Sequence, residues 1–177
     1  HIHGLDTGYA SGALTLIARE PHRSALPLVD AAMTTESTIY RVGNAHITRI
    51  TDRLLTTLPG PKIFPDWSES AVAPCRDAMH PEMLADDDQT LIMSVHSWLI
   101  RIDGLVVLVD TGIGNGKSRP FNRVFDQLNT GYLQRLANAG VRPEDVDLVL
   151  LTHLHVDHVG WNTRLVDGCW QPTFPNA

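Results

Sequence analysis

The sequence predicts an α/β fold, in which helices cover the faces of a sheet. Three segments predict it: two strands joined by a tight turn within Thr90 to Val109, a helix at Tyr132 to Ala139, and a strand at Leu148 to Leu151. Strands and a helix in this order are typical of a layered arrangement. The chain has 177 residues, 43% of them hydrophobic and 19% charged, which suits one globular domain or part of a larger one.

The amino-terminal segment carries two alternative expectations. The chain opens with His1, and the run from Met33 to Glu36 has the form of a natural start. We therefore expect residues 1–32 to be a leader or upstream segment and residues 33–177 to form the domain. The apolar run Leu14 to Ala18 could equally be a genuine strand.

The next segments predict edge strands followed by loops. Thr38 to Ile50 mixes β-branched residues with polar ones, as edge strands do. Leu58 to Pro65 contains three prolines and one glycine, which predicts an irregular loop. Asp66 to Asp88 carries more proline and a run of aspartates, so we expect a solvated loop there.

The central segments give the clearest predictions of strand and helix. Asp103-Gly104 separates two apolar runs, Thr90 to Ile102 and Leu105 to Val109, and Asp-Gly at such a position favours a β-hairpin. In Tyr132 to Ala139 the apolar residues recur at helical spacing, and Gly140 follows where a helix C-cap belongs. The run from Leu148 to Leu151 predicts a second buried strand.

Four potential metal ligands fall within six residues directly after that strand: His153, His155, Asp157 and His158. Residues two apart in extended backbone point the same way, so the first two imidazoles can face one ion. Asp157 and His158 lie on the turn that follows and can serve a neighbouring site. Imidazole and carboxylate ligands suit zinc, with iron or manganese as alternatives. Polar loop residues with two structural histidines are the simpler interpretation, but four such residues in so short a run argue against it.

Two metal ions at this loop would support hydrolysis. Cations about 3.5–4 Å apart can share a bridging water and lower its pKa from about 15.7 toward 7. The nucleophile would then be hydroxide, and the sequence has no G-x-S-x-G turn that would offer a serine instead.

The run from Thr152 to Gly160 matches the H-x-H-x-D-H signature of the metallo-β-lactamase superfamily, and Asp110-Thr111-Gly112 resembles that family's Asp-Thr-Gly turn. The sequence of residues 155–162 and 172–177 is similar to the branch that contains lactonases and methyl parathion hydrolase. The resemblance covers roughly Thr38 to Ala177. It implies an αββα sandwich and a zinc-dependent hydrolase.

The resemblance also implies roles for individual residues. His153 and His155 would bind the first zinc, and Asp157 and His158 the second, with Asp157 also the candidate catalytic residue. Asp110 would support the metal loop from beneath. Complete members of the family have further ligands downstream, whereas residues 159–177 contain no histidine. We therefore expect a truncated, amino-terminal half of the sandwich.

The expected activity is hydrolysis of a lactone, ester or related bond by a metal-bridged hydroxide. One alternative is an iron-dependent redox enzyme of the same fold, because such enzymes use a similar ligand set. The other alternative is an inactive fragment.

The charge balance bears on partners and location. The formal net charge is −6 and the 14 Lys and Arg residues are scattered, which disfavours nucleic acid and anionic membranes as partners and favours a small-molecule substrate. The apolar run Leu105 to Val109 is far shorter than the roughly 18 residues that cross a bilayer. Cys75 and Cys169 are expected to be reduced thiols, so we expect a cytoplasmic protein. The oligomeric state stays open.

Overall fold

The computed structural model describes residues 39–76, 79 and 83–177. All of them fall within one compact unit, Ala32–Ala177. The expected leader, residues 1–32, and the strand-like run Leu14 to Ala18 lie outside the described residues.

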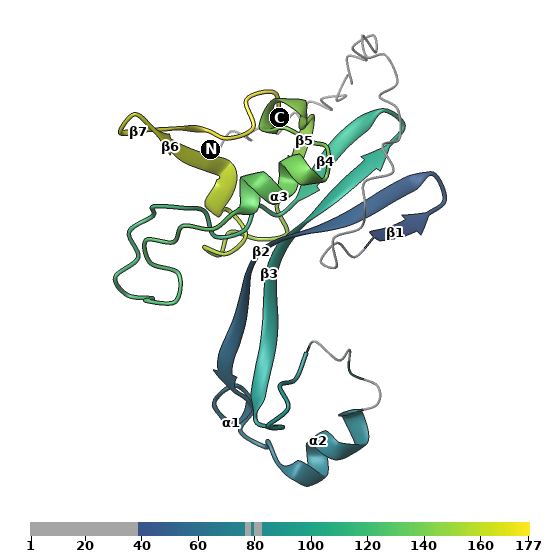
Figure 1. The fold of residues 1–177 in the computed structure, drawn as a ribbon, viewed down its shortest axis with the longest axis vertical. Coiled ribbons are helices and arrows are strands. Elements are labelled where there is room, and N and C mark those ends of the chain that lie inside the picture. The colour runs from purple at the N-terminus through teal and green to yellow at the C-terminus, as the bar shows by residue number, and fades with distance from the viewer. Residues whose placement is uncertain (1–38, 77–78, 80–82) are drawn as a thin grey trace, which may run out of the picture. The chain divides into compact units, whose positions relative to one another are not determined.

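The described residues form a mixed five-stranded sheet, a two-stranded sheet and short helices (Figure 1). The order in the larger sheet is β1-β2-β3-β4-β5, with antiparallel pairs up to β4 and a parallel pair between β4 and β5. The strands are β1 (Ile39–Val42), β2 (Ala45–Pro59), β3 (Thr90–Ile102), β4 (Leu105–Val109), β5 (Leu148–Leu150), β6 (Thr163–Val166) and β7 (Cys169–Pro172). The helices are α1 (Gly60–Ile63), α2 (Glu69–Arg76) and α3 (Tyr132–Asn138), with 3-10 turns at Pro143–Asp145 and Gly160–Asn162.

The hairpin predicted at Asp103-Gly104 is confirmed, because β3 and β4 begin and end where the apolar runs do. Both turn residues have positive φ, 49° at Asp103 and 80° at Gly104. Such angles characterise the two-residue turns whose twist matches that of the flanking strands. The helix predicted from Tyr132 is confirmed too, and Gly140 follows it with φ 74°.

The two predicted loops between β2 and β3 are wrong in part. Strand β2 continues through Pro59, and α1 and α2 form inside the segments expected to be irregular. Pro61 lies in the first turn of α1, where its missing N–H is not needed. The Ser68 hydroxyl accepts a hydrogen bond from the Ala71 amide at 3.2 Å, as an N-cap does, and Glu69 begins α2. Proline therefore lies at the start of α1, and Pro74 lies inside α2.

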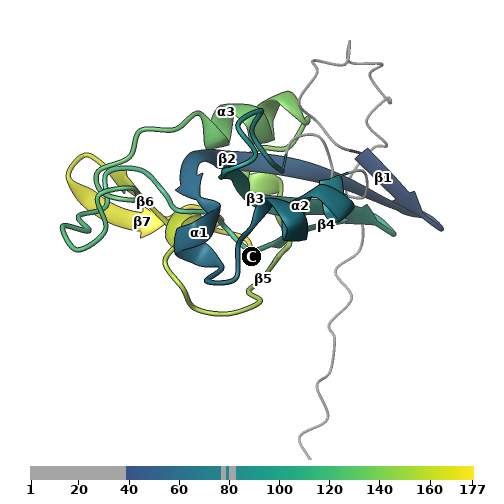
Figure 2. The same cartoon turned by 90° about the horizontal axis from the view of Figure 1, so that it is seen from below.

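The hydrophobic core lies between α3 and one face of the sheet (Figure 2). Leu99 and Leu108 of the sheet and Leu136 of α3 are fully buried. Tyr132 is fully buried as well; its hydroxyl lies 2.6 Å from that of Ser97, and its ring stacks on Trp161 with centroids 5.3 Å apart. Burying one such side chain contributes about 1.5–3 kcal/mol, so this contact fixes α3 and Trp161 against the sheet.

Strand β5 differs from its prediction as a buried strand. Leu148 is 44% exposed and Leu150 is 47% exposed. The reason is position: β5 pairs only with β4 among the described strands and so forms an edge of the sheet. An apolar run by itself cannot distinguish an edge strand from a central one.

Two further observations concern the expectations about membranes and cysteines. No helix in the described ranges is both long and apolar enough to cross a bilayer. Cys75 and Cys169 are exposed free thiols.

Candidate metal centre

The four predicted ligands lie on the loop that follows β5, beside the loop that follows β4. Backbone hydrogen bonds join the two loops. The Thr111 amide donates to the carbonyl of His158, the Gly160 amide to that of Gly112, and the Trp161 amide to that of Thr111, each at 2.7 Å. The ligand loop is therefore held at its carboxyl end by backbone groups that lie nearly 50 residues earlier in the sequence.

This contact is so close that only glycine fits at position 160. A Cβ built on Gly160 would lie 1.8 Å from the Ile113 carbonyl carbon and 2.5 Å from the Gly114 nitrogen. Both are backbone atoms, which cannot turn aside as a flexible side chain can. Steric exclusion of a side chain therefore explains why the motif ends in glycine.

The first pair of predicted ligands lies side by side. The His153 Nε2 and His155 Nδ1 atoms are 3.1 Å apart, and the two ring centroids are 4.6 Å apart. Two ligand atoms bound to one tetrahedral zinc at about 2.0–2.1 Å lie about 3.3 Å from each other. The separation also suits a hydrogen bond between neutral rings, so the geometry permits a shared ion without requiring one.

The second pair has a similar geometry. Asp157 Oδ2 lies 3.4 Å from His158 Nε2, and both side chains are about one quarter exposed, 29% and 26%. The ring of His158 also lies against that of His153, with centroids 3.9 Å apart. All four side chains therefore gather at one place on the surface of the loop, as two neighbouring pairs of donor atoms.

Asp110 supports these side chains from beneath. Its Oδ2 lies 2.8 Å from His158 Nδ1, and its Oδ1 accepts hydrogen bonds from the amide of Thr152 at 2.8 Å and from its hydroxyl at 3.0 Å. Burial raises the pKa of Asp110, but the hydrogen bonds from His158 and Thr152 outweigh that effect and lower it. An ionised Asp110 accepts the Nδ1 proton of His158 and leaves its Nε2 free to bind a metal.

The backbone of Asp110 adopts an unusual conformation. Its φ is 60°, in the left-handed region that aspartate tolerates better than most residues. Strain of this kind persists where the surroundings hold the residue and is common at functional sites. It turns the chain sharply at the end of β4 and brings the Asp110 carboxylate under the ligand loop.

A second carboxylate, Asp52, was not singled out from the sequence. It is 2% exposed and accepts hydrogen bonds from the amides of Ile113 at 2.7 Å and Gly114 at 3.3 Å and from the indole of Trp161 at 3.2 Å. The Thr130 hydroxyl donates to it as well. The sequence signal was weak: one aspartate within a strand otherwise rich in β-branched residues.

A β-bulge explains how Asp52 reaches this position. The register of β2 against β3 shifts between Thr51 and Arg53, so Asp52 is the extra residue on β2. Bulges re-aim side chains and are common next to active sites. Arg135 of α3 satisfies the carbonyls at the bulge, with hydrogen bonds of 2.5 Å to Thr51 and 2.9 Å to Asp52.

The predicted ligands are of the chemical types that bind metal ions, but each pair supplies fewer ligands than a complete zinc site. In the ranges that the structure describes, no group of three or more His, Cys, Asp or Glu side chains could hold an ion together. Each of the two pairs offers nitrogen or carboxylate donors of the kinds zinc prefers, and catalytic zinc normally has three protein ligands. His153 and His155 could hold one ion and Asp157 and His158 a second, each completed by groups from elsewhere.

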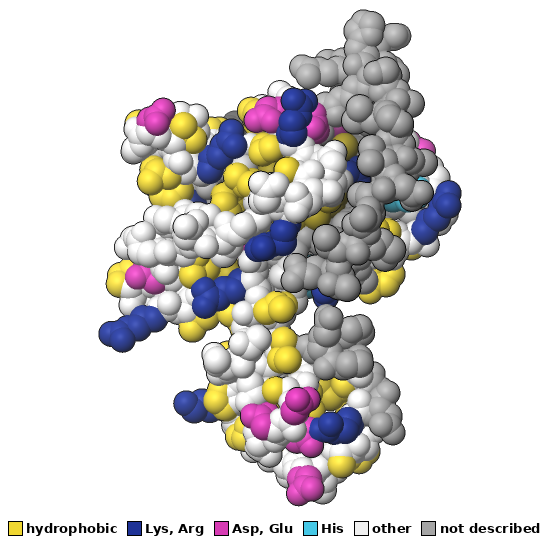
Figure 3. All heavy atoms as spheres, viewed as in Figure 1, with side chains coloured by type: hydrophobic (Ala, Val, Ile, Leu, Met, Phe, Trp, Pro, Cys, Tyr) yellow, Lys and Arg dark blue, Asp and Glu magenta, His cyan; other side chains and the backbone are white. Residues whose placement is uncertain are grey.

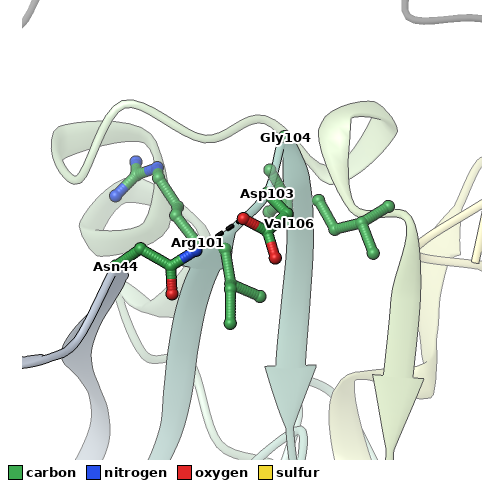
Figure 4. A pocket seen from close by; sticks show the side chains of 7 residues that line it. Asn44, Arg101, Asp103, Gly104 and Val106 are labelled. Carbon is green, nitrogen blue, oxygen red and sulfur yellow. Dashed lines mark hydrogen bonds between the residues drawn. The ribbon is translucent and has the colours of Figure 1, made fainter.

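A cavity of about 220 Å³ lies away from this loop, at the opposite end of β4 (Figure 4). It is lined at the hairpin turns by residues such as Asn44, Arg101 and Asp103. The amide of Asn44 donates to the Asp103 carboxylate at 2.5 Å and ties the two turns together. This hollow is therefore accounted for by turn packing.

The comparison with protein families concerns the half of the chain that contains the ligand loop. The model of the metallo-beta-lactamase superfamily matches residues 92–177, which include both the Asp-Thr-Gly turn and the four predicted ligands. No curated protein sequence matches the chain significantly.

Solved structures of similar fold include three hydrolases. The chain is 26% identical to the hydrolase AbOPH of the beta-lactamase superfamily, with a TM-score of 0.55, and the match covers 82% of this chain and 44% of that one. It is 21% identical to AidC, a dizinc quorum-quenching lactonase, with a TM-score of 0.57 and 80% and 42% covered. A probable metal-dependent hydrolase from Staphylococcus aureus is 24% identical, with a TM-score of 0.57 and 78% and 47% covered.

The chain thus spans less than half the length of these structures. Its described residues share the fold of these three structures. Together with the shared fold, the family match shows that residues 92–177 belong to the metallo-beta-lactamase superfamily.

Proposed function

We propose that the protein is a zinc-dependent hydrolase whose dinuclear metal centre is built partly from this chain. The observation that carries the proposal is the gathering of four metal-binding side chains in two pairs with donor separations of 3.1 Å and 3.4 Å. Two zinc ions bound there would supply an activated water for hydrolysis and would polarise the bond under attack.

Each of these side chains has a role in the proposed centre. His153 and His155 would hold one ion; the Thr152 hydroxyl lies 3.1 Å from His153 Nδ1, and the other nitrogen of that ring, Nε2, faces His155. Asp157 and His158 would hold the other ion, His158 through Nε2, because its Nδ1 lies 2.8 Å from the Asp110 carboxylate. Asp157 is the candidate catalytic residue, because it is the acidic side chain among the four and would place a negative charge at the metal centre.

A lactone, ester or related bond in a small molecule is the proposed substrate. The dizinc lactonase AidC and the hydrolase AbOPH support this class by their shared fold. The net charge of −6 favours an uncharged substrate. On the face drawn in Figure 3, the Lys and Arg side chains of the described residues are interspersed with apolar and acidic ones and form no continuous basic patch.

The test combines metal analysis with turnover. The intact protein should contain two zinc ions per chain and hydrolyse a generic lactone or an aryl ester. Iron in place of zinc, together with oxygen or sulfur chemistry, would favour the redox alternative. Metal-free protein that stays inactive after zinc is added would leave the inactive fragment as the explanation.

Single substitutions then assign the ligands. His155→Ala should lower the zinc content by about one ion, and Asp157→Ala should cause the loss of the other ion. His46→Ala is the matched control, since His46 lies on β2 and its partners in the strand register are Arg41 of β1 and Arg101 of β3. Unchanged zinc content in the first two variants would contradict the proposed centre.

A further inference from the structure

One buried cation lies between the two loops of the candidate centre. The Arg119 residue is 6% exposed. Its Nη2 donates to the carbonyl of Ile113 at 2.7 Å and to that of Val156 at 3.3 Å, and its Nη1 donates to the carbonyl of Phe125 at 3.1 Å. A buried charge is costly unless it is well hydrogen-bonded, and this guanidinium joins three separate backbone segments.

The peptide groups around Ile113 are held from both sides by buried charges. The Asp52 carboxylate accepts the Ile113 amide at 2.7 Å, and Arg119 donates to the Ile113 carbonyl at the same distance. Ile113 is itself fully buried, and its carbonyl is the group on which Gly160 packs. The loop after β4 is thereby fixed, and Arg119 extends from it to the ligand loop.

The Val156 carbonyl is the point of contact on the ligand loop. Val156 lies between His155 and Asp157 in the sequence, and its carbonyl belongs to the peptide bond that joins it to Asp157. Burial lowers the pKa of Arg119, and the negative charges of Asp157, Asp52 and Asp126 oppose that change.

We propose that Arg119 is a positioning residue for the metal centre, which holds the Asp157 side of the ligand loop in place through the Val156 carbonyl. The inference rests on the proposed function. Arginine suits the role because its planar guanidinium reaches three carbonyls in fixed directions, which a lysine ammonium does not reproduce.

The test measures metal affinity and not activity alone. In the intact protein, Arg119→Met should weaken zinc binding about 10- to 100-fold, the range expected when a group that orients a ligand is lost. Arg119→Lys keeps the charge without the planar guanidinium and should recover part of that loss. Chelator competition gives the affinities, and the visible absorption of the cobalt-substituted protein should change in both variants because the ligand geometry changes.

A control separates positioning from stability. Leu136→Ala opens a cavity in the core under α3 and should lower the melting temperature while the folded protein binds zinc as the native protein does. Native affinity in both Arg119 variants would overturn the inference, as would an equal loss of affinity in Leu136→Ala. If neither Arg119 variant folds, Arg119 is a folding residue and the inference also fails. Absence of zinc from the native protein would instead overturn the proposed function.

Discussion

Gly160 shows how one residue can couple two loops. Its amide donates to the Gly112 carbonyl at 2.7 Å, and its Cα lies directly against the Ile113 peptide group. The missing side chain therefore allows the ligand loop to approach the loop after β4 closely enough for three backbone hydrogen bonds. His158 lies two residues before this contact, so a shift at Gly160 is passed to a predicted ligand.

Gly160→Ala should therefore damage both stability and metal binding. The added Cβ meets backbone atoms, and overpacking of this kind costs about 1–3 kcal/mol or more in the free energy of unfolding. Denaturant unfolding and zinc content would measure the two effects. Gly131→Ala is the matched control: Gly131 has negative φ, and a Cβ there would meet no backbone atom, only the Arg135 guanidinium at 3.3 Å. Similar losses in the two variants would contradict the steric explanation.

At the scale of secondary-structure elements, the β3–β4 hairpin depends on its two turn residues. Gly104 has φ 80°, and a Cβ added to it would meet no heavy atom within 4 Å. A side chain therefore has room there, and only the backbone is constrained. The conformational preference can be tested at this position without a packing effect.

Gly104→Ala should destabilise the protein by about 1 kcal/mol, because alanine adopts the left-handed region at a cost of about 1–2 kcal/mol. Gly104→Asn should cost less, since asparagine tolerates that region. Denaturant midpoints of the two variants would measure the difference. Equal stability of the alanine variant and the native protein would show that the turn conformation is not as described.

The turn before β3 is pH-dependent for a local reason. Asp87 accepts hydrogen bonds from the amides of Gln89 and Thr90, both at 2.9 Å, and from the Thr90 hydroxyl at 2.7 Å. These bonds, led by the Gln89 amide, lower the pKa of Asp87. The folded form thus holds its proton less tightly than the unfolded chain does.

The turn should therefore be stable above the pKa of a free aspartate and should loosen as the pH falls through the lowered pKa of Asp87. The amide resonances of Gln89 and Thr90 would follow this transition by NMR, and Asp87→Asn should abolish it. A transition midpoint at or above the pKa of a free aspartate would contradict the prediction.

At the scale of the whole molecule, metal binding and folding should be linked. The loop that carries the predicted ligands is ordered by backbone hydrogen bonds to the loop after β4 and by the bond from Trp161 to Asp52 of β2. Asp52 also binds the loop after β4, and the unfolded chain lacks all of these contacts. Zinc that binds only the folded state stabilises it by about 2.7 kcal/mol at a concentration 100 times the dissociation constant.

Excess zinc should raise the melting temperature of the metal-free protein, and a chelator should reverse the change. The double variant His155→Ala with Asp157→Ala should show no zinc-dependent shift, because each predicted pair has lost one donor. Calorimetry or dye-based melting would measure these temperatures. A shift of equal size in the double variant would locate the zinc elsewhere.

The sequence by itself determined those parts of the protein that depend on near neighbours. The β3–β4 hairpin follows from Asp103-Gly104 between two apolar runs, and α3 follows from its helical spacing and Gly140. The four candidate ligands are also local, because they fall within six residues of one loop. Short-range rules misjudged α1, where Pro61 lies in the first turn, and α2, where Pro74 lies within the helix.

Only the tertiary structure decided what surrounds those ligands. Asp110 reaches His158 from 48 positions away, and the bulge in β2 carries Asp52 to Trp161 across 109 positions. Periodicity does not encode such distances, since strand pairing and packing bring the segments together after the local elements form. The role of Asp110 was implied only by the resemblance of its Asp-Thr-Gly turn to that of a known family, and nothing implied that of Asp52. The same reason explains why Arg119 looks like an ordinary basic residue in the sequence and lies buried between two loops in the fold.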